Sequence, residues 1–185
     1  MVKNTPKKWS EISFEKYLQT LELPEMPDNL TSEQQEVFNM GRSAELLSIV
    51  SGASIEQINN SKPNDVIEAF TALNFMQTEM PKVKVKHKAK TTKEITYQNF
   101  LDYINYSKSK DSHRYLPDII SLFFNDLKSE DVMKMPTDYV FSCFFLLLKK
   151  AKRYWKISLF KTARELMTHL IREAIGKLKL KLKSK

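Results

Sequence analysis

The stretch ISFEKYLQTL at residues 12–21 matches the stretch ITYQNFLDYI at residues 95–104 position for position. Three further pairs of segments follow in the same order, namely 46–50 with 119–123, 54–58 with 129–132, and 63–70 with 136–143. Four matches in one order predict two copies of a single helical unit. The copies share apolar spacing and helix caps, and they do not share catalytic residue types.

The composition favours a globular helical chain. Hydrophobic residues make up 42% of the 185 positions, which is enough to form the core of one domain or of two small ones. Only three glycines occur, which argues against hairpin-rich sheets and phosphate-binding loops. We therefore predict an all-α fold in which a Lys-rich linker joins two homologous helical units and a basic C-terminal helix follows. The expected parts are residues 1–80, 81–94, 95–155 and 156–185.

Local signals predict where the helices of the first unit begin and end. Side chains that cap helices, and a glycine that stops one, occur in the order Ser13, Thr31 with Gln34, Gly52, Ser54 with Gln57, and Asn64. The second helix should bury one apolar stripe made of Val37, Phe38, Met40, Ala44, Leu47 and Val50.

The segment PKVKVKHKAK at residues 81–90 alternates with period two and has no helical stripe. This pattern predicts an extended, solvated linker with room for one short exposed strand. A lysine-rich edge also prevents a strand from pairing with other chains, so the pattern does not by itself indicate DNA binding.

Charge is distributed unevenly along the chain. Residues 1–81 carry six Lys or Arg and twelve Asp or Glu, for a net charge of −6, whereas residues 82–185 carry 24 and 10, for +14. An acidic N-terminal part and a basic C-terminal part attract each other, and the basic part also attracts polyanions. Self-assembly and nucleic-acid binding are therefore both open.

Residues typical of catalysis are few, and we expect no catalytic residue, metal site or cofactor. His87, His113 and His169 are scattered without metal-ligand spacing, and Cys143 lies on an apolar helix face that predicts a buried thiol. The single cysteine excludes a disulfide within the chain. The first ten residues lack a signal peptide's apolar stretch, and the run at 140–148 is too short to span a membrane. We therefore expect a soluble intracellular protein that is not an enzyme.

Two groups of residues are candidates for binding. The run at 144–148 is apolar on all sides and must lie in a core or an interface, which predicts a protein-binding surface formed by Phe141, Phe144, Phe145, Leu147 and Leu148. The basic candidates for polyanion binding are Lys149, Lys150, Lys152, Arg153, Lys156, Lys177, Lys179 and Lys181. A protein-docking face, a nucleic-acid site and a membrane-surface helix all fit this basic region, in decreasing order of preference.

Two blocks of the sequence resemble the tail assembly chaperones of tailed phages. One block comprises residues 46–58 with 66–75, and the other comprises residues 95–102, 116–124, 135–138 and 144–146. The basic region from Tyr154 onward is similar to the cargo proteins of gut phages with crowded capsids. The resemblance implies a non-enzymatic protein of virion assembly that binds other phage structural proteins. It also implies a location in the host cytoplasm during assembly, with retention in the virion left open.

Overall fold

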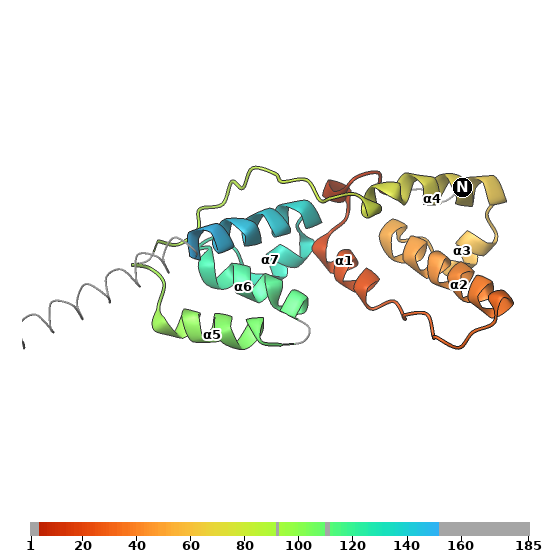
Figure 1. The fold of residues 1–185 in the computed structure, drawn as a ribbon. Coiled ribbons are helices and arrows are strands. Elements are labelled where there is room, and N and C mark those ends of the chain that lie inside the picture. Colours follow the sequence, from red (N-terminus) through yellow and green to blue (C-terminus); the bar gives the residue numbers. More distant parts are fainter. Residues whose placement is uncertain (1–3, 92, 110–111, 152–185) are drawn as a thin grey trace, which may run out of the picture. The chain divides into compact units, whose positions relative to one another are not determined.

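The computed structural model describes residues 4–91, 93–109 and 112–151, which form helices and no strand (Figure 1). The chain forms two compact units, Met1–Phe144 and Phe145–Lys185. The α-helices are α1 (Phe14–Leu21), α2 (Ser32–Ser51), α3 (Ile55–Asn59), α4 (Pro63–Ala72), α5 (Tyr97–Ser107), α6 (Leu116–Phe123) and α7 (Ser129–Lys134). Three 3₁₀ turns, η1 (Trp9–Glu11), η2 (Leu73–Gln77) and η3 (Ser112–Tyr115), accompany them, and residues 137–151 are also helical. The all-α prediction is confirmed for the described part of the chain.

Helix caps occur at Ser13, Thr31, Gly52 and Ser54, as the sequence predicts. The Ser13 hydroxyl accepts a hydrogen bond from the Lys16 backbone N–H. Complete capping boxes start three further helices, at Thr31 with Gln34, Ser54 with Gln57, and Thr96 with Asn99. Gly52 ends α2 with φ 78°, a left-handed conformation that glycine adopts without steric cost. The predicted cap at Asn64 is wrong: Lys62 is the N-cap residue and Pro63 opens α4, because proline has no N–H that would need a partner there.

Helix α1 is tied at its start to a segment more than a hundred residues away. An antiparallel bridge joins Ser13 to Pro136, in which the Phe14 N–H donates to the Met135 carbonyl at 2.9 Å. The Thr137 N–H and hydroxyl both donate to the Ile12 carbonyl, at 2.9 Å and 2.8 Å. Helix α1 also contacts both α2 and α7. Helix α1 therefore packs against helices that lie before and after the lysine-rich segment in the sequence.

The buried apolar side chains of the N-terminal helices form a cluster of Ile12, Leu47, Val50, Ile58, Ala69 and Leu73. Other buried apolar side chains come from α1, from α6 and α7 with the residues between them, and from residues 137–144; they include Phe14, Ile119, Ile120, Phe124, Val132, Val140 and Cys143. Helix α6 packs against both α5 and α7. Burial is consequently concentrated around α1 and α6 and is sparse along the first half of α2.

The lysine-rich segment is extended, as its alternating pattern predicts, but it has only an isolated bridge, between Ala89 and Phe124. Lysines 82, 84, 86 and 88 are exposed, while the residues between them are half-buried and Ala89 is buried. Side-chain hydroxyls bind its backbone, since Ser142 accepts from the Val83 N–H at 3.0 Å and Tyr139 from the Lys86 N–H at 2.8 Å. The segment therefore lies along the helix that begins at residue 137.

Among the described residues, no helix combines the length and the apolar character that a membrane crossing requires.

Candidate functional site

The predicted protein-binding residues lie on the helix over residues 137–151. Phe141 is half-buried, with its ring 6.0 Å from the Phe14 ring and 5.6 Å from the Tyr17 ring in edge-on geometry. Phe144 is also half-buried. In the second compact unit, Phe145 is 48% exposed, and Leu147 and Leu148 are half-buried. Phe141 therefore belongs to the core around α1, and Phe145 is the most exposed of the five.

The structure describes two of the eight predicted basic residues. Lys149 is exposed and Lys150 is half-buried. Lys152, Arg153, Lys156, Lys177, Lys179 and Lys181 lie outside the described residues, as does the predicted C-terminal helix.

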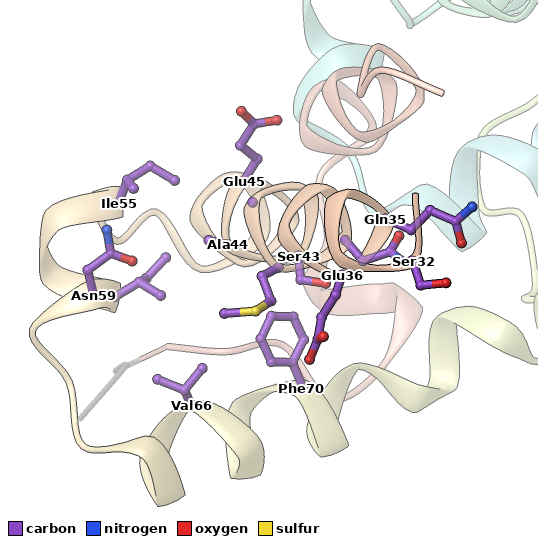
Figure 2. Close-up of a pocket in the computed structure, with 14 residues that line it drawn as sticks. Ser32, Gln35, Glu36, Ser43, Ala44, Glu45, Ile55, Asn59, Val66 and Phe70 are labelled. Atoms are coloured by element: carbon purple, nitrogen blue, oxygen red, sulfur yellow. The ribbon is translucent and has the colours of Figure 1, made fainter. Parts of the chain in front are cut away.

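A groove that the sequence did not predict lies among helices α2, α3 and α4, with a volume of about 860 Å³ (Figure 2). Val66 and Phe70 point from α4 toward α2, and Glu36 extends from α2 beside Phe70 (Figure 2). The lining residues are Ser32, Gln35, Glu36, Asn39, Met40, Gly41, Ser43, Ala44 and Glu45 of α2, Ile55, Ile58 and Asn59 of α3, and Val66 and Phe70 of α4. We call this site the α2–α4 groove.

The first half of α2 has no buried side chain. Buried residues of this helix are Leu47, Val50 and Ser51, all near its end. Val37 is 70% exposed and Met40 is 66% exposed, so the predicted inward stripe is wrong over these turns. Helices in proteins are stabilised mainly by packing of an apolar face, yet the first half of α2, which the capping box at Thr31 starts, has only half-buried and exposed side chains. Within the part of the chain that the structure describes, Val37 and Met40 therefore leave apolar surface exposed.

The charged lining residues of the groove are both glutamates, and no Lys, Arg or His is among them. Glu36 extends beside Phe70, whereas the carboxylate of Glu45 points to the other side of α2 (Figure 2). Ion pairs join Lys8 to Glu11, Arg114 to Glu22 and His87 to Asp126, and these three do not include a lining residue of the groove. The groove combines an apolar wall with the carboxylate of Glu36, which suits an apolar ligand that carries positive charge.

Gly41 lies in the lining of the groove and in the middle of α2. A Cβ atom built on it would meet no other atom within 4 Å, so no neighbouring side chain requires a glycine there. Glycine weakens a helix interior relative to alanine by roughly 0.5–1 kcal/mol. A glycine at the centre of a helical pattern is the one sequence signal that points to this groove, and periodicity alone does not reveal it.

Among the residues that the structure describes, no three His, Cys, Asp or Glu side chains are placed to hold a metal ion. Cys143 is buried, as predicted, and burial raises the pKa of its thiol to about 12. His87 Nδ1 lies 2.7 Å from Asp126 Oδ2, and this hydrogen bond lowers the pKa of the Asp126 carboxyl.

Comparison with protein-family models, with characterised proteins and with solved structures finds no match for this chain.

Proposed function

We propose that this chain is a non-enzymatic protein that binds a partner protein through apolar helical surfaces during assembly of a tailed-phage virion. The observation that carries the binding role is the uncovered first half of α2 beside the α2–α4 groove, where Met40 is 66% exposed. Exposed apolar side chains gathered around a groove are typical of protein-binding surfaces. The resemblance to tail assembly chaperones supplies the phage context, with action in the host cytoplasm and other virion proteins as partners.

A second candidate function is nucleic-acid binding by the basic C-terminal region, in the manner of a packaged cargo protein. The observation in its favour is the net charge of +14 over residues 82–185, to which the exposed Lys149 contributes. Basic segments bind phosphate backbones without any groove, so this function does not need the α2–α4 groove. The two functions therefore predict different effects of salt concentration on the DNA affinity and different effects of substitutions on partner binding.

Salt dependence separates the two functions. If residues 149–185 bind DNA, the logarithm of the affinity falls with the logarithm of the salt concentration by about 0.9 per phosphate contact. Changing Lys149, Lys150, Lys152 and Arg153 to Gln then flattens this slope by roughly three to four units. Because we favour a protein partner, we expect weak DNA binding by the full chain in fluorescence anisotropy across a salt series.

Partner capture provides the complementary measurement. The full chain is co-expressed with the structural proteins of its phage, and the bound proteins are identified by mass spectrometry together with those of purified particles. We expect the four-Gln variant to retain its partner and Leu147→Asp to lose much of it, since Leu147 belongs to the apolar run. Tight, salt-dependent DNA binding by the unmodified chain, with no phage protein co-purifying, would reverse the choice in favour of packaging.

The duplication predicted from sequence is part of the proposal. In the predicted repeat, α1, α2, α3 and α4 correspond in order to α5, α6, α7 and the helix over residues 137–151. The lengths differ most for the second pair, since α2 has 20 residues and α6 has 8. We expect residues 12–78 and 95–155 to superpose helix for helix, with Phe14 over Tyr97 and Pro63 over Pro136. Helices that follow different paths in the two halves would exclude the duplication.

A further inference from the structure

We propose that the α2–α4 groove binds a basic amphipathic helix of a partner protein, and that Gly41 is where the backbone of that helix comes closest to α2. This inference rests on the proposed protein-binding function and names the class of partner. It does not depend on the phage context or on the apolar run at 141–148.

The length of the groove and its wall indicate a helical ligand. The lining residues of α2 run from Ser32 to Glu45, a span of roughly 20 Å at the rise of an α-helix, which matches three to four turns of a second helix. Met40, Val66 and Phe70 supply an apolar wall across α2 and α4. Amphipathic helices bind such grooves through apolar residues spaced three and four apart.

The charge around the groove indicates the sign of the ligand. Residues 32–72 contain six carboxylates and two cationic side chains, for a net charge of −4, and both charged lining residues are glutamates. A partner helix with Lys or Arg beside its apolar stripe would place a cation next to Glu36, which extends beside Phe70 (Figure 2). The whole chain has a net charge of +8, which repels a basic ligand. Binding of a basic peptide would therefore depend on a local acidic surface and not on the overall charge of the chain.

Gly41 indicates where the helices are closest. Its place in the helix interior is unfavourable for α2 alone, and the space where its side chain would lie is empty to 4 Å. Glycine is the residue that allows another backbone to approach closely. A partner helix crossing α2 at this position explains why a destabilising residue stands in the middle of α2, in the lining of the groove.

The test uses the full chain and labelled synthetic peptides of about 14 residues, the length that the groove accommodates. The probe contains only Leu and Lys, with leucines at every third or fourth position. One control peptide has the same composition with its leucines distributed around the helix instead of along one face, and another replaces each Lys by Glu. In fluorescence anisotropy we expect the probe to bind at least about tenfold more tightly than either control.

Two variants locate the binding site on the chain. Met40→Lys should weaken binding of the probe at least about tenfold, whereas Met26→Lys, the same change at a Met that is 42% exposed outside the groove, should not. Gly41→Leu should weaken binding at least about tenfold while the midpoint of thermal unfolding stays at or above that of the unmodified chain. A purely structural role for Gly41 predicts no change in binding.

Other outcomes overturn the inference in distinct ways. Equal affinities for the three peptides would show that the groove does not select a basic helix. The same conclusion would follow if Met26→Lys lowered the affinity for the probe as much as Met40→Lys does. A dimer of the full chain in analytical ultracentrifugation that Met40→Lys dissociates would make a second copy the ligand instead. If no peptide binds while phage proteins still co-purify with the chain, this inference fails and the proposed function stands.

Discussion

Replacing Phe14 with Ala is expected to lower the free energy of unfolding by about 3–5 kcal/mol, the usual cost of removing a fully buried phenylalanine. Phe14 is 0% exposed, and its ring lies 5.8 Å from that of Tyr17 and 6.0 Å from that of Phe141. Truncation leaves a cavity beside the bridge that joins α1 to the start of the helix at residue 137. The measurement is urea unfolding followed by circular dichroism, which should show a lower midpoint.

Tyr97 provides a matched control for Phe14. The repeat predicted from the sequence pairs the two residues, and each is the first residue of a capped helix, yet Tyr97 is 75% exposed. Tyr97→Ala should therefore change the free energy of unfolding by no more than about 0.5 kcal/mol. Similar losses in the two variants would mean that Phe14 is not the buried residue that joins α1 to the rest of the fold.

Alkylation of Cys143 in the folded protein should be at least about a thousandfold slower than that of an ordinary thiol at pH 8. Burial raises the pKa of this thiol from 9.0 to about 12, and the thiolate fraction at pH 8 falls by about that factor. Iodoacetamide labelling followed by mass spectrometry measures the rate, and Cys143 is the only cysteine in the chain. Unfolding in urea should restore ordinary reactivity.

An exposed cysteine introduced elsewhere supplies the reference rate. Met26 is 42% exposed, so Met26→Cys in a chain that also carries Cys143→Ala should react as a normal thiol. A rate for Cys143 within about tenfold of this reference would contradict the raised pKa. The folded state holds the thiol proton more tightly than the unfolded state, so Cys143 also makes the free energy of unfolding fall as the pH rises from 9 toward 12.

The sequence predicted the helices well because their boundaries depend on local interactions. Ser13, Thr31 and Ser54 cap helices through hydrogen bonds to N–H groups three residues away, and Gly52 ends α2 through its own backbone conformation. The burial of Cys143 followed from its place on an apolar helix face. Residues 82–89 alternate between exposed and covered side chains as their period-two pattern predicts.

The candidate site was predictable only in part, because periodicity gives the phase of an apolar stripe and not the element that covers it. Val37 and Met40 are on the same predicted stripe as Leu47 and Val50, but only the last two are buried. The groove forms because the first half of α2 lacks such cover, and that depends on where α3 and α4 lie. Phe141 was predicted as a binding residue, yet it packs against Phe14 and Tyr17.

The sequence by itself determined the fold class, the helix caps, the extended lysine-rich segment and the separation of charge, since each depends on residues that are neighbours along the chain. Only the tertiary structure decided that Phe14 is buried and Tyr97 exposed at matching positions. The pairing of Ser13 with Pro136 brings α1 against residues more than a hundred positions away and gives Phe14 a core to enter. Repeated local patterns carry no information about such long-range pairing, so two similar helices reach different environments.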